Sequence, residues 1–169
     1  QEASRKLGFS VANTMRVAQQ LYESGKITYM RTDSVNISGL AMAKSKEVIE
    51  KTFGKEYVKN RKYTTKTKGA QEAHEAIRPT YMDRPVTQGS AQEQKLYELI
   101  WKRTIASQMA DALLEKTNVE IDISTSKEKF VARGEVIKFE GFLKVYLESS
   151  DDESQEQDTC MLPPLKTGQ

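Results

Sequence analysis

A tyrosine and an arginine stand two residues apart in ITYMRTDS, residues 27–34. In an extended segment, side chains at i and i+2 point the same way, so Tyr29 and Arg31 are predicted to share a face opposite Met30. A phenol with a pKa of about 10 is almost wholly protonated at neutral pH, so a nucleophilic tyrosine needs a positive charge or a base nearby. The Arg31 guanidinium can supply that charge and bind a phosphate oxygen. A core tyrosine beside a solvent-facing arginine is the alternative, and spacing alone does not separate the two.

The chain's single histidine, His74, lies in QEAHEAIRPT, residues 71–80. If AQEAHEAI forms a short helix that ends before Pro79, Arg78 lies one turn after His74 on the same face. Such a pair suits an anion, and histidine can pass protons near neutral pH. One histidine with two nearby glutamates matches no metal-ligand spacing, so we predict no metal site in this chain. A structural histidine near a helix end is the alternative.

Residues 57–69, YVKNRKYTTKTKG, interrupt the helical periodicity with five cations and no acid. Cations interleaved with aromatic rings are typical of surfaces that hold single-stranded nucleic acid. Lys59, Arg61 and Lys62 are therefore candidate nucleic-acid contacts, with two tyrosines beside them for stacking. A solvated charged loop is an equally common explanation for this composition.

Composition restricts the class of protein. The 169 residues are 37% hydrophobic and 30% charged, which suits a soluble globular protein with a modest core. No apolar run approaches the roughly 20 residues that cross a bilayer, and the first ten residues hold no apolar signal-peptide segment. The lone cysteine, Cys160, excludes an internal disulfide. We expect a cytoplasmic protein with no membrane partner.

Charge is distributed unevenly along the chain. Residues 1–110 carry 19 Lys and Arg against 11 Asp and Glu, a net charge of +8, whereas residues 111–169 carry 7 against 13, a net charge of −6. A basic first part suggests a polyanionic partner. Scatter around the overall charge of +2 is the plain alternative.

Three helices are predicted to position the motifs. Ser10 caps one that Gly25 ends, Ser38 caps a second that runs to about residue 53, and residues 90–93 form a capping box that begins a third. A further short helix is predicted to end at Gly8. Because the chain begins without methionine and inside that helix, we expect a fragment of a larger protein.

The pattern changes from helical to β near residue 113. Val119, Ile121 and Ile123 alternate with polar residues, which predicts a half-buried strand. Residues 130–147 continue as β structure with bulges or bends at Gly134 and Gly141. An acidic loop and a further strand follow. The predicted fold class is α+β, with a helical domain at residues 1–112 and an antiparallel β-rich domain at residues 113–169.

Taken together, these segments resemble the type IA DNA topoisomerases. Residues 7–34, LGFSVANTMRVAQQLYESGKITYMRTDS, are similar to the family's active-site region, and QEAHEAIRPT to its second motif. QKLYELIWKRTIASQM resembles the long helix that follows, and FVARGEVIKFEGFLKVY the β segment after it. The resemblance covers nearly the whole chain in order. Met30 favours the bacterial topoisomerase I branch over the topoisomerase III branch, where proline is typical.

The resemblance implies a mechanism and a set of site residues. It makes Tyr29 the nucleophile of a 5′-phosphotyrosine link, places Arg31 on the scissile phosphate and puts His74 nearby. It also matches four further nucleic-acid-binding positions whose roles are less defined: Thr32, Asp33, Ser34 and Arg78.

The resemblance also implies which partners the chain has and which parts of the enzyme lie outside it. The parent enzyme relaxes negatively supercoiled DNA without ATP, and its Mg²⁺ is bound by a Toprim domain outside this chain. The expected partners are single-stranded DNA and the remaining domains of the parent, with no small-molecule substrate. The β-rich part corresponds to some of the family's arch domain, and the isolated fragment is expected to be inactive.

Two other classes of function are weighed against this one. A non-enzymatic DNA-binding module would use residues 10–24 and 38–53 as a helix-turn-helix pair, but the intervening dozen or so residues exceed the usual 3–4-residue turn. A purely structural interaction domain would predict that replacing Tyr29 leaves strand cleavage intact.

Overall fold

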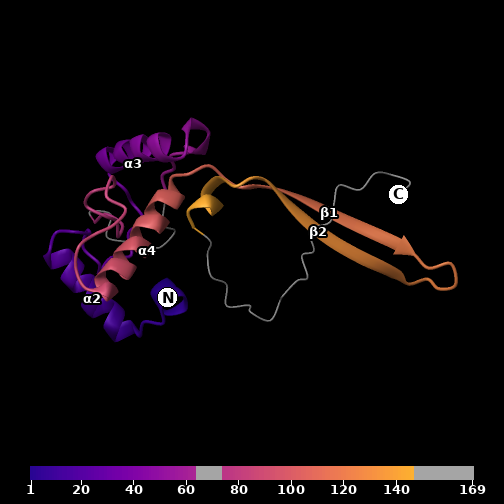
Figure 1. Ribbon diagram of the computed structural model, residues 1–169, viewed down its shortest axis with the longest axis horizontal. Helices are drawn as coiled ribbons and strands as arrows, with labels where there is room; N and C mark the ends of the chain where they lie inside the picture. The colour runs from indigo at the N-terminus through magenta and orange to yellow at the C-terminus, as the bar shows by residue number, and fades with distance from the viewer. Residues whose placement is uncertain (64–73, 147–169) are drawn as a thin grey trace. The chain divides into compact units, whose positions relative to one another are not determined.

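The computed structural model of the chain describes residues 1–63 and 74–146 (Figure 1). These residues divide into two compact units, one of residues 1–111 with 142–146 and the other of residues 112–141. The elements of the first unit are α1 (Glu2–Leu7), α2 (Val11–Glu23), α3 (Gly39–Thr52), the 3₁₀ turn η1 (Lys55–Tyr57), α4 (Ala91–Ser107) and the 3₁₀ turn η2 (Gly141–Lys144). The second unit contains β1 (Leu113–Asp122) and β2 (Lys129–Phe139). Helices with an antiparallel sheet confirm the predicted α+β class.

Side-chain caps begin the three long helices, as predicted. The Ser10 hydroxyl accepts a hydrogen bond from the backbone of Asn13, and Ser38 caps α3 in the same way. Ser90 and Glu93 form the full capping box of α4, in which the Glu93 carboxylate accepts from the Ser90 N–H at 2.8 Å. Each cap satisfies backbone donors that a helix leaves without partners.

The hydrophobic core of the helical unit gathers around α4, which packs against α2. Leu21 of α2 and Ile105 of α4 are fully buried. The Trp101 indole donates to the Met82 carbonyl at 2.8 Å, which ties α4 to the preceding loop. The buried stripe of α3 is Ala41, Ser45 and Ile49, spaced by one turn. Met42, Val48 and Phe53 are half-buried beside this stripe.

Gln108 at the end of α4 fixes the described part of the basic loop. Its fully buried side-chain amide accepts from the Arg61 N–H and donates to the Arg61 carbonyl, both at 3.1 Å. The Gln108 carbonyl also accepts from the Lys59 N–H at 3.1 Å. The backbone of this loop is therefore held by the side chain and the carbonyl of one residue at a helix terminus.

We expect Gln108→Leu to lower the free energy of unfolding by about 2 kcal/mol, because it leaves two backbone groups of Arg61 without partners. The single Trp101 is buried and reports unfolding by its fluorescence in urea. The control is Gln20→Leu on the exposed side of α2, with an expected change within about 0.5 kcal/mol. Equal effects of the two changes would contradict this account of Gln108.

The second unit is a two-stranded antiparallel hairpin in which Val119 pairs with Ala132 and Ile121 with Phe130. The predicted strand is present, but its apolar side chains are less buried than predicted. Ile121 and Phe130 are both exposed. Two strands alone offer no second layer to cover an apolar face.

The β structure beyond residue 130 differs from the prediction in its bulges and in its extent. Gly134 pairs with Thr117 in regular register and forms no bulge, whereas the irregularity lies between Leu113 and Leu114. Gly141 does bend the chain, with φ of 51° at the start of η2, so β structure ends at Phe139. Residues 142–146, which the sequence analysis groups with the β-rich domain, belong to the helical unit. The acidic loop and the last predicted strand lie outside the described residues.

Candidate active site

Two distant segments, residues 26–36 and 74–80, lie side by side and form the base of the site. Ile27 and Pro79 make an antiparallel bridge. The hydrogen bonds that join the segments include Thr28 N to Arg78 O (2.9 Å), Thr80 N to Lys26 O (3.0 Å), Ala76 N to Asn36 O (2.7 Å), Thr28 Oγ1 to Ala76 O (2.7 Å) and Arg78 N to Thr28 Oγ1 (2.9 Å). The tyrosine motif and the histidine motif therefore converge, although about 45 residues separate them along the chain.

The predicted helix over residues 70–77 is wrong for its described part, since residues 74–77 are not helical. The residue before a proline is pushed toward extended conformations, which disfavours a helix running to Pro79. The backbone groups of this segment bond instead to the neighbouring one. The helix-turn-helix alternative loses support for the same reason, because the chain between α2 and α3 pairs with residues 74–80.

Tyr29 is a surface residue with its ring in an aromatic cluster. Its side chain is 41% exposed, while the next residue, Met30, is 6% exposed and supplies the core contact. The Tyr29 ring lies edge-on to Tyr22 at 5.2 Å between centroids and to His74 at 6.3 Å. These three residues, with Thr28 and Glu75, line an open cavity of about 490 Å³. The geometry therefore excludes the core-residue explanation of Tyr29.

The residues after Tyr29 form an exposed loop shaped by hydroxyl groups. Arg31 and Asp33 are exposed. The Thr32 hydroxyl accepts from the Ser34 N–H at 3.0 Å, and the Ser34 hydroxyl accepts from the Asn36 N–H at 3.1 Å. Tyr29 and Arg31 are thus both solvent-facing with Met30 buried between them, as the spacing predicted. Among the described residues, no hydrogen bond joins Arg31 to Tyr29.

Arg78 is held by the carboxylate of Glu75, which was not among the predicted site residues. Its Nη2 bonds Glu75 Oε2 at 2.5 Å and its Nη1 donates to the Pro79 carbonyl at 2.9 Å. Glu75 also accepts from the N–H of Ser38, the N-cap of α3, at 2.9 Å. Arg78 and His74 therefore do not form the predicted helical pair, because Glu75 engages the guanidinium. The sequence feature that could have predicted this ion pair is Glu75, three residues before Arg78 in HEAIR.

Two buried polar atoms of this site have no partner within the described part of the chain, Nδ1 of His74 and Nε of Arg78. Buried donors and acceptors are nearly always paired in folded proteins. His74 also lines the open cavity at Tyr29, and an unpaired polar atom in such a place is typical of a site that receives a polar ligand.

Partial burial raises the pKa of Glu75, but hydrogen bonds from Ser38 and Arg78 outweigh it and lower that pKa below its ordinary value. The carboxylate is therefore ionised at neutral pH. Within residues 1–63 and 74–146, no group of three or more His, Cys, Asp or Glu side chains could hold a metal ion. These residues do not fit a Mg²⁺ site.

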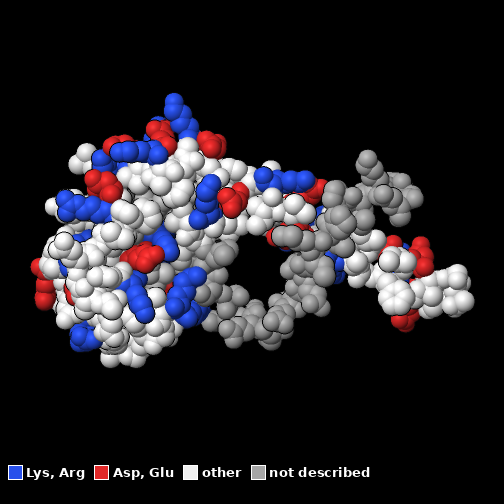
Figure 2. Space-filling view, in the orientation of Figure 1, with Lys and Arg blue, Asp and Glu red and all other residues white. Residues whose placement is uncertain are grey.

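The predicted nucleic-acid contacts of the basic loop are mostly paired with an acid. Asp111 binds Lys59 at 2.5 Å and Arg61 at 2.6 Å, and these bonds lower the pKa of its carboxyl. Lys62 is exposed, whereas Tyr57 is buried and cannot stack on a base. Figure 2 shows Lys and Arg mixed with Asp and Glu over the visible face of the helical unit. The remainder of the basic loop, residues 64–69, lies outside the described residues.

Comparison with known proteins decides the family. The family model described as DNA topoisomerase matches residues 1–169. The chain belongs to the bacterial type IA DNA topoisomerases. It is 48% identical over 175 residues to DNA topoisomerase 1 of Synechocystis, covering 99% of this chain and 19% of that protein. It is also 48% identical over 174 residues to DNA topoisomerase 1 of Zymomonas mobilis, covering 99% of this chain and 14% of that protein.

A solved topoisomerase structure has the same fold. The full-length topoisomerase I from Thermotoga maritima matches with a TM-score of 0.75 and 36% identity, over 99% of this chain and 27% of that one. The topoisomerase segment studied thus spans between 14% and 27% of these three proteins. None of the helices within its described residues has the length and apolar character to span a membrane.

Proposed function

We propose that this chain is the tyrosine-bearing part of a topoisomerase that cuts and rejoins one DNA strand through Tyr29. The phenolic oxygen attacks a backbone phosphorus, a new O–P bond forms and the bond from phosphorus to the 3′-oxygen breaks. The phenolic proton is lost and the departing 3′-oxygen gains one, which leaves a 5′-phosphotyrosine and a free 3′-hydroxyl. The observation that carries this proposal is an exposed Tyr29 in an open cavity beside His74, on a segment whose next residue is buried.

The neighbouring residues have separate roles in this proposal. Arg31, exposed on the same segment, neutralises the phosphate and the charge that develops in the transition state. His74 contacts the phosphate or carries the proton, which would engage its unpaired Nδ1. Arg78, held by Glu75, keeps the histidine segment in place.

The reverse reaction closes the strand after another strand has passed. The 3′-hydroxyl attacks the phosphotyrosine and restores the original bond, so the bond energy is conserved and ATP is not required. Relaxation of negative supercoils runs downhill. In this proposal Mg²⁺ supports the reaction from a Toprim domain outside this chain, and no step assigned to the described residues passes through the metal. The cytoplasm, which holds bacterial DNA, is its location.

The reaction is tested by trapping the covalent intermediate. The complete topoisomerase that carries this sequence is mixed with a 3′-end-labelled single-stranded oligonucleotide and Mg²⁺, then denatured and digested with protease. We expect the labelled downstream fragment to be joined through its 5′-phosphate to the peptide that contains Tyr29, identified by mass spectrometry. A label on any other residue would refute the assignment.

We expect the isolated chain to leave supercoiled plasmid unrelaxed in the presence of Mg²⁺, because the proposed metal site lies in another domain. Agarose gel electrophoresis of the plasmid measures this. The complete enzyme serves as the positive control under the same conditions. Relaxation that persists through further purification and is lost in Tyr29→Phe would show that the isolated chain is competent.

We expect Asp111→Asn to strengthen binding of single-stranded DNA by up to about fivefold, because it releases Lys59 and Arg61 from an exposed ion-pair cluster. Fluorescence anisotropy of a labelled oligonucleotide at several salt concentrations measures the affinity. Asp83→Asn removes the same charge from another exposed position and is expected to change affinity much less. Equal gains from the two variants would mean that only net charge matters.

A further inference from the structure

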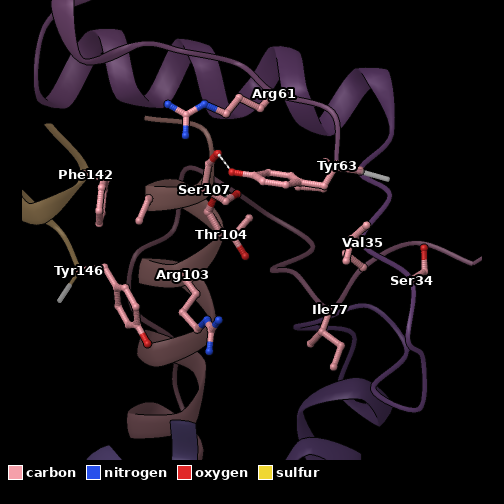
Figure 3. Close-up of a pocket in the computed structure, with 13 residues that line it drawn as sticks. Ser34, Val35, Arg61, Tyr63, Ile77, Arg103, Thr104, Ser107, Phe142 and Tyr146 are labelled. Atoms are coloured by element: carbon pink, nitrogen blue, oxygen red, sulfur yellow. Dashed lines mark hydrogen bonds between the residues drawn. The ribbon is translucent and has the colours of Figure 1, made fainter. Parts of the chain in front are cut away.

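A second cavity, of about 530 Å³, adjoins the two paired segments on the helical unit (Figure 3). Ser34 and Val35 of the tyrosine segment line it, as do Ala76 and Ile77 of the histidine segment. His74 lines the cavity at Tyr29, and Ile77 lines this one. Three residues of chain span at most about 11 Å, so the two cavities are near neighbours.

The chemistry of this second cavity is cationic and aromatic. Arg103 and Arg61 contribute guanidinium groups, that of Arg61 being paired with Asp111, and the thirteen lining residues include no Asp or Glu. Tyr63, Phe142 and Tyr146 contribute aromatic rings. Proteins bind the phosphates of single-stranded nucleic acid through guanidinium groups and stack its bases on aromatic rings.

The lining residues are held in place by the fold. The Tyr63 hydroxyl donates to the Ser107 carbonyl at 2.9 Å, which fixes the ring against the end of α4 while 43% of the side chain stays exposed. The Arg103 guanidinium lies 5.6 Å from the centre of the Tyr146 ring. Figure 3 shows Ser107, Thr104 and Arg103 in succession along α4, with the Tyr63 ring directed at Ser107 and Ile77 across from the helix.

We propose that this cavity binds one nucleotide of the single strand whose backbone reacts at Tyr29. The base packs among the aromatic rings, with Tyr63 as the accessible platform. The neighbouring phosphate lies on Arg103, with Arg61 at the rim. The inference rests on the proposed function, since it takes the occupant to be the DNA strand that Tyr29 cuts.

The first test maps the contact by photochemistry. The 169-residue chain is irradiated in EDTA with single-stranded oligonucleotides that carry 5-iododeoxyuridine at successive positions, and cross-linked peptides are sequenced by mass spectrometry. We expect cross-links to Tyr63, Phe142 or Tyr146. Cross-links found only at residues outside the cavity would overturn the inference.

The second test measures affinity by fluorescence anisotropy with matched variants. We expect Tyr63→Leu to weaken binding about fivefold through loss of stacking, and Tyr63→Phe, which keeps the ring but loses its hydrogen bond to Ser107, to weaken binding clearly less. Arg103→Ala is expected to reduce the slope of log affinity against log salt by about 0.7, as for one lost phosphate contact. Lys95→Ala removes one charge from an exposed position on the same helix and should leave the slope unchanged.

Trp101 fluorescence in urea establishes that each variant is folded before its affinity is interpreted. Equal behaviour of Tyr63→Leu and Tyr63→Phe, or of Arg103→Ala and Lys95→Ala, would overturn the inference. Because the binding tests need neither Mg²⁺ nor cleavage, they are independent of the phosphotyrosine assay. A phosphotyrosine at Tyr29 without cross-links in the cavity would support the proposed function and overturn this inference. Cross-links in the cavity without a phosphotyrosine at Tyr29 would support the binding site and overturn the proposed reaction.

Discussion

Replacing Tyr29 by phenylalanine is expected to abolish covalent capture of DNA by the complete topoisomerase. The substitution removes one oxygen atom, which is the proposed nucleophile, and keeps the ring that packs against Tyr22 and His74. Loss of a nucleophile removes the covalent step itself, so the cleavage rate should fall by about a thousandfold or more. Denaturing gel analysis of a labelled oligonucleotide measures the covalent product.

The neighbouring phenol provides a matched control for this substitution. Tyr22 lines the same cavity, is 40% exposed and stacks edge-on with Tyr29. We expect Tyr22→Phe to retain most of the cleavage, because its oxygen is not the nucleophile. Cleavage by Tyr29→Phe at a rate close to that of Tyr22→Phe would instead favour the structural-domain hypothesis, in which Tyr29 has no chemical role.

Helix termini were predictable because the signals that set them are local. Ser10, Ser38 and Ser90 each bond to a backbone N–H three residues later, so the cap can be recognised within four residues of sequence. Gly8 and Gly25 adopt positive φ values of 66° and 68°, a conformation that glycine adopts at little cost. These interactions do not depend on the rest of the fold.

The arrangement of the site was harder to predict because it depends on contacts between distant segments. The pairing of Ile27 with Pro79 replaces a helix that the local pattern of residues 70–77 favoured. Charge counting likewise treated Lys59 and Arg61 as available, although Asp111, some fifty residues later, binds both. The family resemblance predicted that the tyrosine and histidine motifs lie close together. It did not predict that backbone hydrogen bonds join the two segments.

Aromatic residues show the same limitation. Tyr57 and Tyr63 flank the same cations in the sequence, yet Tyr57 is buried beside Phe53 and Tyr63 is exposed in a cavity. The difference arises because Tyr57 ends a 3₁₀ turn directed at the core, whereas Tyr63 bonds to the end of α4. Only the packed structure distinguishes a stacking platform from a core ring.

Glu75→Gln is expected to weaken both stability and cleavage, because this carboxylate joins Arg78 to the N-cap of α3. The Glu75 side chain is 28% exposed and that of Arg78 is 14% exposed, so solvent screens the pair only in part. We expect the free energy of unfolding to fall by about 1–2 kcal/mol, measured by Trp101 fluorescence in urea. Displacement of His74 and Arg78 should slow cleavage about tenfold or more.

The control is Glu98→Gln, which removes the same charge from an exposed i,i+4 pair with Lys102 on α4. Its expected effect on stability is about 0.5 kcal/mol or less, and cleavage should be unchanged. A double-mutant cycle of Glu75→Gln with Arg78→Gln isolates the energy of the pair. Additive effects in that cycle would show that the contact contributes nothing to stability.

The pH dependence of this effect has a definite sign. Because the pKa of Glu75 is lowered in the folded protein, its contribution to stability is fully present above the ordinary glutamate pKa of about 4.3. That contribution is lost as the pH falls through the lower pKa of the folded state. The difference in stability between the unchanged chain and Glu75→Gln should therefore be largest near pH 7 and shrink below about pH 4. A difference that stays constant from pH 7 to pH 3 would mean that the glutamine disturbs packing, and that the charge of Glu75 does not hold Arg78 in place.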